Sequence, residues 1–343
     1  MSEIKVNNIQ SLSGTNGPVI SGTVEMNSNG AMSLPRGDTT YRGGRGRGII
    51  FGGYLNPANI NGINYITIST TGDSIDFGDL SQTADSSAAF ASSTRGLCAG
   101  GKRTPSRTDS NLIDYVTIAS TGNAFDFGDL TVTMFQGAGC SNNTRGVIYT
   151  DAASPAGPYN IDYIEIATKG NASTFGDAIN PPNIKRSSLG AVSNSTRGLF
   201  AGGGNPDKSA NIEYLTFSTL GSSANFGDLL NAVRYPLACS SSTRGVFYET
   251  GSRSPLSSVN TISYVTINSL GSAIDFGDGN ASTAYGGCSN QIRGVFAGVG
   301  PSPFVNIEYI TIATTGDATN FGDITSGATS DMMSTSDAHG GLR

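Results

Sequence analysis

Hydrophobic and polar residues along this chain follow the short patterns of extended strands, and no stretch shows the spacing of an amphipathic helix. Residues 189–195, 199–204, 211–219 and 224–230 illustrate the pattern, because each stretch is rich in β-branched, aromatic or small residues. Gly, Ser, Asn or Pro bound each stretch, as they usually bound strands. The pattern predicts four short β-strands in about fifty residues, and an all-β fold.

The third stretch of each group indicates how the strands pack. In residues 63–68, Ile63 and Tyr65 lie on one side of an extended strand, whereas Ile66 and Ile68 lie on the other. A sheet with one face in water would instead alternate apolar and polar residues. We therefore expect small sheets that are covered on both faces.

The four-strand pattern recurs six times. An Arg-Gly pair, a Tyr and a Phe-Gly-Asp triplet follow one another in each unit, with 45 to 51 residues between successive triplets. The triplets begin at Phe77, Phe127, Phe175, Phe226, Phe276 and Phe321. The Arg-Gly pairs begin at Arg47, Arg95, Arg145, Arg197, Arg244 and Arg293. Six four-stranded sheets stacked face to face predict a six-bladed β-propeller over residues 39–343.

The repeated unit resembles a divergent kelch repeat. Paired glycines follow an aromatic-containing strand at 49–53 and 199–204, and a Tyr follows later, as in kelch repeats. The triplet Phe stands where kelch repeats carry Trp, and Arg186 and Arg234 resemble the Arg before the first kelch strand. The third and fifth units lack the paired glycines, although the period is unchanged. The resemblance implies a kelch-like propeller.

Residues 40–343 are also similar to repeat proteins of tailed phages that infect marine cyanobacteria. The similarity includes the segments "STRG" and "IATTG" and the ending "MMSTSDAHGGL". Such proteins are generally regarded as fibre-like or structural virion proteins. The resemblance therefore implies a location in the phage particle and other virion proteins as partners, and it leaves self-association open.

Residues 1–38 lie outside the repeats and are more loosely similar to attachment segments of such virion proteins. They contain two short alternating stretches but too few residues for a core of their own. We expect a short extended N-terminal anchor segment that contacts other virion proteins. An unattached leader is the alternative.

The last unit continues beyond its triplet. Residues 332–341 align with residues 285–294, and therefore supply one more first strand. This strand can complete the sheet that begins near Arg47 and so close the ring of blades. Residues 39–44 are the alternative source of that strand.

Composition restricts the function. Charged residues make up 13% of the chain, the net charge is −6 and residues 43–48 are the one basic stretch, which argues against nucleic acid as a partner. No apolar run reaches the roughly 20 residues needed to cross a bilayer, so we expect no membrane insertion. The four Cys show no zinc-site spacing and are expected to be buried free thiols.

No motif predicts catalysis, a cofactor or a metal site. The Asp-Phe-Gly sequences at 76–78 and 126–128 recur with the repeat and lack the other kinase motifs, so we interpret the Phe as a wedge between blades. The repeat Arg and the triplet Asp fit either a framework or an ion-binding ring, and their presence in every unit favours the framework. His339, beside Asp337, is expected to be structural or exposed, because the sequence ties no nucleophile to it.

Loop variability distinguishes the two faces of the predicted disc. Alternating strand direction places the first-to-second and third-to-fourth turns on one face, here called the constant face because these turns hardly vary. The other loops, including 102–111, 150–160, 179–188 and 251–260, differ in every unit and lie on the opposite, variable face. The candidate binding residues there are Lys102, Arg103, Arg107, Asp109, Tyr159, Lys185, Arg186, Tyr235 and Arg253.

The resulting hypothesis is a fibre-like or appendage subunit of the virion. Its polar, Tyr-containing variable loops would bind a host-surface polysaccharide without turnover. The alternative is a capsid or tail decoration subunit with a purely structural role. An enzyme such as a glycan lyase or hydrolase is a third hypothesis, which the sequence does not favour because it shows no paired carboxylates apart from the repeat.

Overall fold

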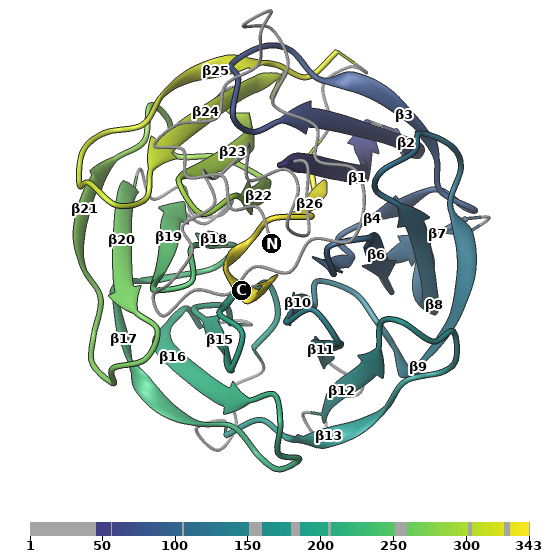
Figure 1. The fold of residues 1–343 in the computed structure, drawn as a ribbon, viewed down its shortest axis with the longest axis horizontal. Coiled ribbons are helices and arrows are strands. Elements are labelled where there is room, and N and C mark those ends of the chain that lie inside the picture. Colours follow the sequence, from purple (N-terminus) through teal and green to yellow (C-terminus); the bar gives the residue numbers. More distant parts are fainter. Residues whose placement is uncertain are drawn as a thin grey trace, which may run out of the picture. The chain divides into compact units, whose positions relative to one another are not determined.

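The computed structural model describes residues 46–342, except for 56, 105, 151–159, 180–185, 205–206, 251–258, 301–303 and 326–329. The expected anchor segment and the alternative closing strand at 39–44 lie outside the described residues. Six antiparallel sheets surround a central axis (Figure 1), so the fold is a six-bladed β-propeller, as the repeat predicts. Among the described residues, no helix is long and apolar enough to span a membrane.

Blades are numbered in chain order, and the strands of each are given from the axis outward. Blade 1 contains β26 (Met333–Ser336), β1 (Arg47–Leu55), β2 (Ala58–Thr67) and β3 (Ile75–Asp79). Blade 2 contains β5 (Ala88–Ala91), β6 (Arg95–Ala99), β8 (Thr108–Thr117) and β9 (Phe125–Met134), with the short strands β4 (Ala84–Asp85) and β7 (Lys102–Arg103). Blade 3 contains β10 (Ala138–Ser141), β11 (Arg145–Thr150), β12 (Asn160–Glu165) and β13 (Ser173–Asp177).

The last three blades follow the same order. Blade 4 contains β14 (Gly190–Ser193), β15 (Arg197–Ala201), β16 (Ser209–Thr216) and β17 (Ala224–Val233). Blade 5 contains β18 (Leu237–Ser240), β19 (Arg244–Thr250), β20 (Asn260–Thr266) and β21 (Ile274–Asp278). Blade 6 contains β22 (Gly286–Ser289), β23 (Arg293–Val299), β24 (Asn306–Thr311) and β25 (Thr319–Asp323).

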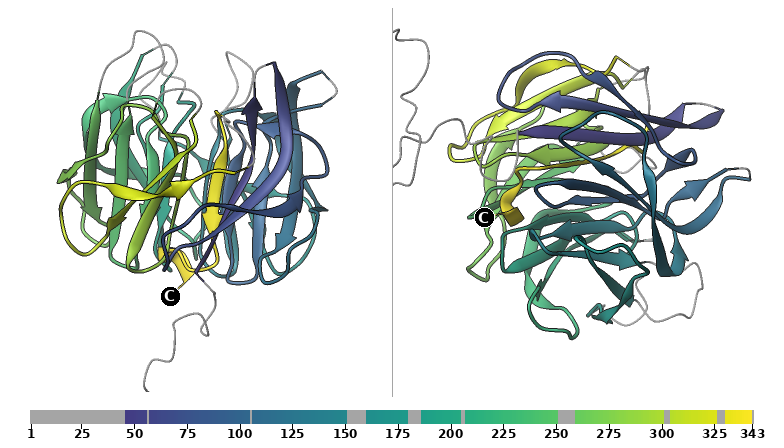
Figure 2. Two further views of the ribbon diagram at one scale, coloured as in Figure 1. Left: turned by 90° about the horizontal axis from the view of Figure 1, so that it is seen from above. Right: turned by 45° about the vertical axis from the view of Figure 1, so that its right-hand side comes forward.

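The C-terminal strand closes the ring. Strand β26 pairs antiparallel with β1, with Thr335 opposite Ile49, so blade 1 is built from both ends of the repeat region. The backbone N–H of Arg47 also donates to the Asp337 carboxylate at 2.8 Å. The 3-10 turn η2 (Gly340–Leu342) follows and lies at the constant face (Figure 2). Of the two closing strands that the sequence allowed, the C-terminal one is confirmed.

The hydrophobic core is divided among the interfaces between neighbouring blades, here called seams. The second strands are buried on both faces, as in β11, where every residue after Arg145 is buried. Six hydrophobic clusters each join two blades. In one of them, Phe127 of blade 2 packs with Ile148 and Ile164 of blade 3. Because each seam needs both blades, the ring stabilises its own units.

The triplet Phe occupies a β-bulge in every blade. In blade 1 the strand register passes from the pair Ile63–Gly78 to the pair Asn64–Asp76 and leaves Phe77 without a partner opposite. The other five blades show the same shift. The bulge accounts for the burial of Phe77 within a strand that is otherwise largely exposed. Gly78 has φ of +145°, and a Cβ there would lie 2.5 Å from a backbone oxygen of the next blade, so glycine is required.

The four cysteines are buried and free, as expected. Three of them explain the glycine of the Arg-Gly pair. In the seam between blades 3 and 4, a Cβ on Gly198 would lie 2.6 Å from the Cys140 Sγ. In the seam between blades 6 and 1, a Cβ on Gly48 would lie 2.8 Å from the Cys288 Sγ. The absent side chain therefore makes room for a thiol of the preceding blade.

Candidate functional site

The repeat arginines connect neighbouring blades. Arg95 Nη1 donates to the backbone oxygen of Ile166 in blade 3 at 2.7 Å, and its guanidinium lies over the ring of Tyr115 in its own blade. Arg293 of blade 6 makes the same contact with Ile68 of blade 1, so the pattern runs around the whole ring. Equivalent contacts are made by Arg47, Arg145, Arg197 and Arg244. The repeat arginines thus belong to the framework.

The triplet Phe residues also belong to the framework. Phe127, Phe226 and Phe321 are each 3% exposed and lie in three different seams. Their rings meet the repeat Tyr of the same blade edge to face, as for Phe226 and Tyr214, whose ring centroids are 6.1 Å apart. Offset and edge-to-face contacts of this kind are favourable between aromatic rings.

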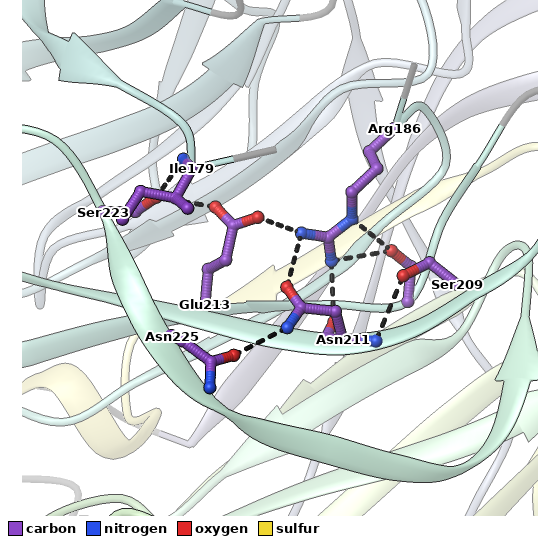
Figure 3. A network of polar contacts seen from close by, with 8 residues as sticks. Ile179, Arg186, Ser209, Asn211, Glu213, Ser223 and Asn225 are labelled. Atoms are coloured by element: carbon purple, nitrogen blue, oxygen red, sulfur yellow. Dashed lines mark hydrogen bonds and ion pairs between the residues drawn. The ribbon is translucent and has the colours of Figure 1, made fainter. Parts of the chain in front are cut away.

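Two of the predicted binding residues are buried inside their blades. Arg186 is fully buried, pairs with the Glu213 carboxylate and donates to the Gly202 carbonyl oxygen at 2.8 Å (Figure 3). Arg103 is 1% exposed and pairs with Asp114 at 2.6 Å. Neither guanidinium faces a ligand from outside, so the prediction of surface binding was wrong for these two residues.

Arg103 and Arg186 fill the same position of two blades from different loops. Arg103 belongs to the loop between the second and third strands, whereas Arg186 precedes the first strand. Asp114 and Glu213 both stand directly before the repeat Tyr, and a buried carboxylate needs a cation or hydrogen-bond donors. In both blades the guanidinium group therefore lies beside the buried carboxylate, although the two arginines come from different loops.

Blades 3 and 6 also carry an acid at this position, and among the described residues no arginine pairs with it. Burial raises the pKa of Asp162 and of Glu308. The backbone N–H of Thr131 donates to Asp162 at 2.9 Å, and that of Asn280 donates to Glu308 at 3.3 Å. In both cases the donor comes from the preceding blade, so these acids also join blades.

Lys102, Arg107 and Asp109 lie on the surface of blade 2. Lys102 pairs with Asp109 at 2.8 Å. Arg107 pairs with Asp85 at 2.7 Å, and its guanidinium lies 4.1 Å from the centre of the Tyr54 ring. These contacts fix the projecting hairpin of β7 and β8. The predicted residues Tyr159, Lys185 and Arg253 lie outside the described residues.

The axial channel reaches the variable face at a ring of residues with left-handed backbone. These residues stand two positions before an inner strand and have φ between +54° and +61°. They are Ser86, Gln136, Ser188, Tyr235 and Asp331. Their backbones are hydrogen-bonded in series. The N–H of Tyr235 donates to the Ser188 carbonyl oxygen, that of Ser188 to Gln136, that of Gln136 to Ser86, and that of Ser86 to Asp331. All five line a cavity here called the mouth.

Side chains that precede the inner strands of blades 3, 4 and 5 are connected at the mouth. Ser188 Oγ donates to Gln136 Oε1 at 3.1 Å, and Gln136 Nε2 donates to Tyr235 Oη at 2.7 Å. Tyr285, also in the lining, packs edge to face against Phe304. The mouth has about 430 Å³ of space, part of which is open to solvent. Fixed amide, hydroxyl and aromatic groups can bind the hydroxyls and apolar faces of sugars.

The sequence analysis named Tyr235 as a candidate binding residue and placed Ser188 in a variable loop. It assigned no binding role to Gln136, Tyr285 and Asp331. The signal that could have found them is positional, because a polar or aromatic residue stands one or two positions before most inner strands. Those positions meet around the axis once the ring closes.

Below the mouth the channel is lined by small residues. The second residues of the inner strands are Ala89, Gly139, Ala191, Ala238, Gly287 and Ser334. A ring of serines at the ends of the inner strands surrounds the constant end of the channel. Each hydroxyl donates to the backbone oxygen of the preceding blade, in the pairs Ser141–Ala91, Ser193–Ser141, Ser240–Ser193, Ser289–Ser240 and Ser336–Ser289.

His339 and the turn η2 close the constant end of the channel. The His339 Nε2 lies 2.9 Å from the Ala91 carbonyl oxygen, and the Gly341 N–H donates to Nδ1 at 3.1 Å. Nδ1 is therefore an acceptor and Nε2 carries the proton. Burial lowers the pKa of His339 to about 4, so the imidazole is neutral at pH 7. These contacts give His339 a structural role.

No protein-family model matches this chain, and no curated protein matches it. Among the described residues, no group of three or more His, Cys, Asp or Glu is placed to hold a metal ion. The mouth of the channel on the variable face is therefore the candidate binding site.

Proposed function

We propose that this protein is a fibre-like or appendage component of a phage particle that binds a host-surface polysaccharide at the mouth of its propeller. The observation that carries the proposal is the fixed arrangement of Gln136, Ser188 and Tyr235 across the mouth. An amide and two hydroxyls are held at set distances before any ligand arrives, which lowers the ordering cost of binding.

The lining of the mouth favours an uncharged ligand. Among its described residues Asp331 is the one charged group, and none is Lys or Arg. Nucleic acids and strongly acidic polymers need several cationic contacts. Neutral sugars need hydroxyl and amide partners together with apolar surface, which Tyr285 and Leu237 provide.

The mouth and the first described residue of the propeller lie on opposite faces. Gly46 lies at the constant face, where its carbonyl oxygen accepts from Ile68 N–H. We propose recognition at the mouth and attachment to other virion proteins through residues 1–38.

Binding without cleavage fits the chemistry of the mouth. Most glycoside hydrolases use two carboxyl groups that flank the scissile bond. The described lining of the mouth offers Asp331 alone. We therefore propose recognition and not turnover.

An array of bacterial surface polysaccharides, including those of marine cyanobacteria, tests the proposal. We expect the wild-type protein to bind at least one neutral polysaccharide and Tyr235→Ala to bind it at least tenfold more weakly. Leu220→Ser is the control, because Leu220 is 58% exposed in the turn between β16 and β17 on the constant face. Equal loss in both variants, or no binding by the wild type, would contradict the proposal.

The alternative role as a decoration subunit makes a different prediction. Both roles predict loss from particles when residues 1–38 are removed, but a purely structural subunit would bind no surface polysaccharide. The array therefore distinguishes the two roles, and particle incorporation tests the anchor that they share.

A further inference from the structure

We propose that the channel takes the neutral terminal residue of a polysaccharide chain, so that the ligand is recognised by its end and not along its length. This inference rests on the proposed function, because it concerns the same site. The inference specifies which part of the polysaccharide is recognised and how the site holds that part.

Three neighbouring cavities follow one another from the mouth to the serine ring. The mouth and the middle section share Leu189, Leu237 and Met333 in their linings. The middle section and the lowest section share Ala89, Ala191 and Ser334, among others. Space at the axis of the propeller therefore adjoins the mouth at the variable face.

The constant end of the channel is closed to a passing chain. Gly341 of η2 packs directly on the Ser141 carbonyl oxygen, and Gly340 packs on that of Ser241. Gln291 Nε2 donates to the His339 backbone oxygen at 3.0 Å, which ties the turn to blade 6. Because this end is filled by the protein's own chain, a polymer cannot thread through the ring, and only a chain end can enter.

The channel walls allow entry because they carry almost no side-chain bulk. A Cβ on Gly287 would lie 2.5 Å from the Ala238 carbonyl oxygen, so neighbouring inner strands approach as closely as backbones permit. Ala89 and Ala191 contribute single methyl groups to the wall. A larger side chain at Ala89 or Ala191 would fill part of the space that these residues line.

One hydroxyl of the wall is unsatisfied. Ser334 Oγ is buried and has no hydrogen-bond partner among the described residues, although Ser334 lines both lower sections. An unsatisfied buried hydroxyl is unfavourable, and a sugar hydroxyl would supply the missing partner. The described linings of all three sections contain no Lys or Arg, which favours a neutral terminal residue over an acidic one.

Stoichiometry distinguishes recognition of ends from recognition of internal residues. The probe is a neutral cyanobacterial surface polysaccharide, partly hydrolysed and separated by size, and titrated calorimetrically into the full-length protein. End recognition predicts one bound protein per chain at every chain length. Internal recognition predicts a number of bound proteins that rises with chain length, and this result would overturn the inference while leaving the proposed function intact.

Filling the channel provides a second test. Ala191→Leu places a larger side chain in the wall and is expected to weaken binding at least tenfold. Ala232→Leu is the matched control, because Ala232 is an exposed residue of the same blade. Wild-type affinity in Ala191→Leu would overturn the inference. If Ala191→Leu does not fold, the stoichiometry of the wild type still decides the question. Absence of binding by the wild type to any polysaccharide would instead overturn the proposed function, and the inference with it.

Discussion

The Nε2 atom of His339 lies 2.9 Å from the carbonyl oxygen of Ala91, and Ala91 ends the one inner strand that lacks the terminal serine of the other five. In the other blades that serine hydroxyl connects each strand to the preceding one. The imidazole also lies 3.4 Å from the hydroxyl of Ser141. The C-terminal residues are therefore bonded to blade 2 as well as to blade 1.

Lowering the pH should reduce the unfolding free energy of the protein, because the buried His339 resists protonation. Its pKa is about 4 in the folded state and about 6.5 ordinarily, so the unfolded chain takes up a proton first as the pH falls. The stabilisation is complete above pH 6.5 and is lost between pH 6.5 and pH 4. Between pH 7 and pH 4.5, the wild type should lose roughly 2 to 3 kcal/mol more unfolding free energy than His339→Gln.

Urea unfolding at the two pH values measures this difference. The buried acids Asp162 and Glu308 titrate in both proteins, so their effects cancel in the comparison. Parallel pH profiles for the wild type and His339→Gln would show that the imidazole does not control the acid response.

Phe127 and Phe125 lie two residues apart on β9 but should respond very differently to truncation. Phe127 is 3% exposed in a seam, whereas Phe125 is 63% exposed. We expect Phe127→Ala to lower the unfolding free energy by about 3 to 5 kcal/mol. Phe125→Ala should change it by less than about 1 kcal/mol. Similar values for the two variants in chemical denaturation would contradict the assignment of the triplet Phe to the seam.

Gly128 and Gly170 allow the effect of backbone strain on stability to be distinguished from the effect of a close contact. Their φ angles are nearly equal, at +150° and +155°. A Cβ on Gly128 would lie 2.5 Å from the Gly170 carbonyl oxygen, whereas a Cβ on Gly170 would meet nothing within 4 Å. Gly128→Ala should therefore be less stable than Gly170→Ala by about 1 to 3 kcal/mol. Melting temperatures of the two variants provide the measurement, and equal values would show that strain alone requires these glycines.

Removal of the Arg103 charge should strongly lower the unfolding free energy. Arg103→Met leaves Asp114 buried without its cation, and we expect a loss of about 3 to 5 kcal/mol. Lys102→Met is the control, because its pair with Asp109 is partly exposed and should contribute less than about 1 kcal/mol. The double variant Arg103→Met with Asp114→Leu should recover much of the loss. Stability near that of the wild type in Arg103→Met alone would contradict a structural role for the pair.

The period of the sequence was sufficient to predict the ring, because features such as Phe127 and Arg95 recur at positions that only a circular stack brings into contact. The burial of Arg103 and Arg186 could not be predicted in the same way. Both lie in loops that differ between units, and their position depends on a carboxylate elsewhere in the blade. The contact of Gln136 with Tyr235 passes over a whole blade, so it depends on the curvature of the ring and not on local sequence.

The pairing of Thr335 with Ile49 has a consequence for biosynthesis. Blade 1 cannot be completed until β26, which follows the other five blades in the sequence, has been synthesised, so until then the nascent chain can form only an open arc of blades. Contacts this distant in sequence make folding slow. In the closed ring, a blade cannot separate from the others unless both of its seams break together. Slow unfolding, and hence long survival of the native protein after synthesis, should follow from the position of that one strand.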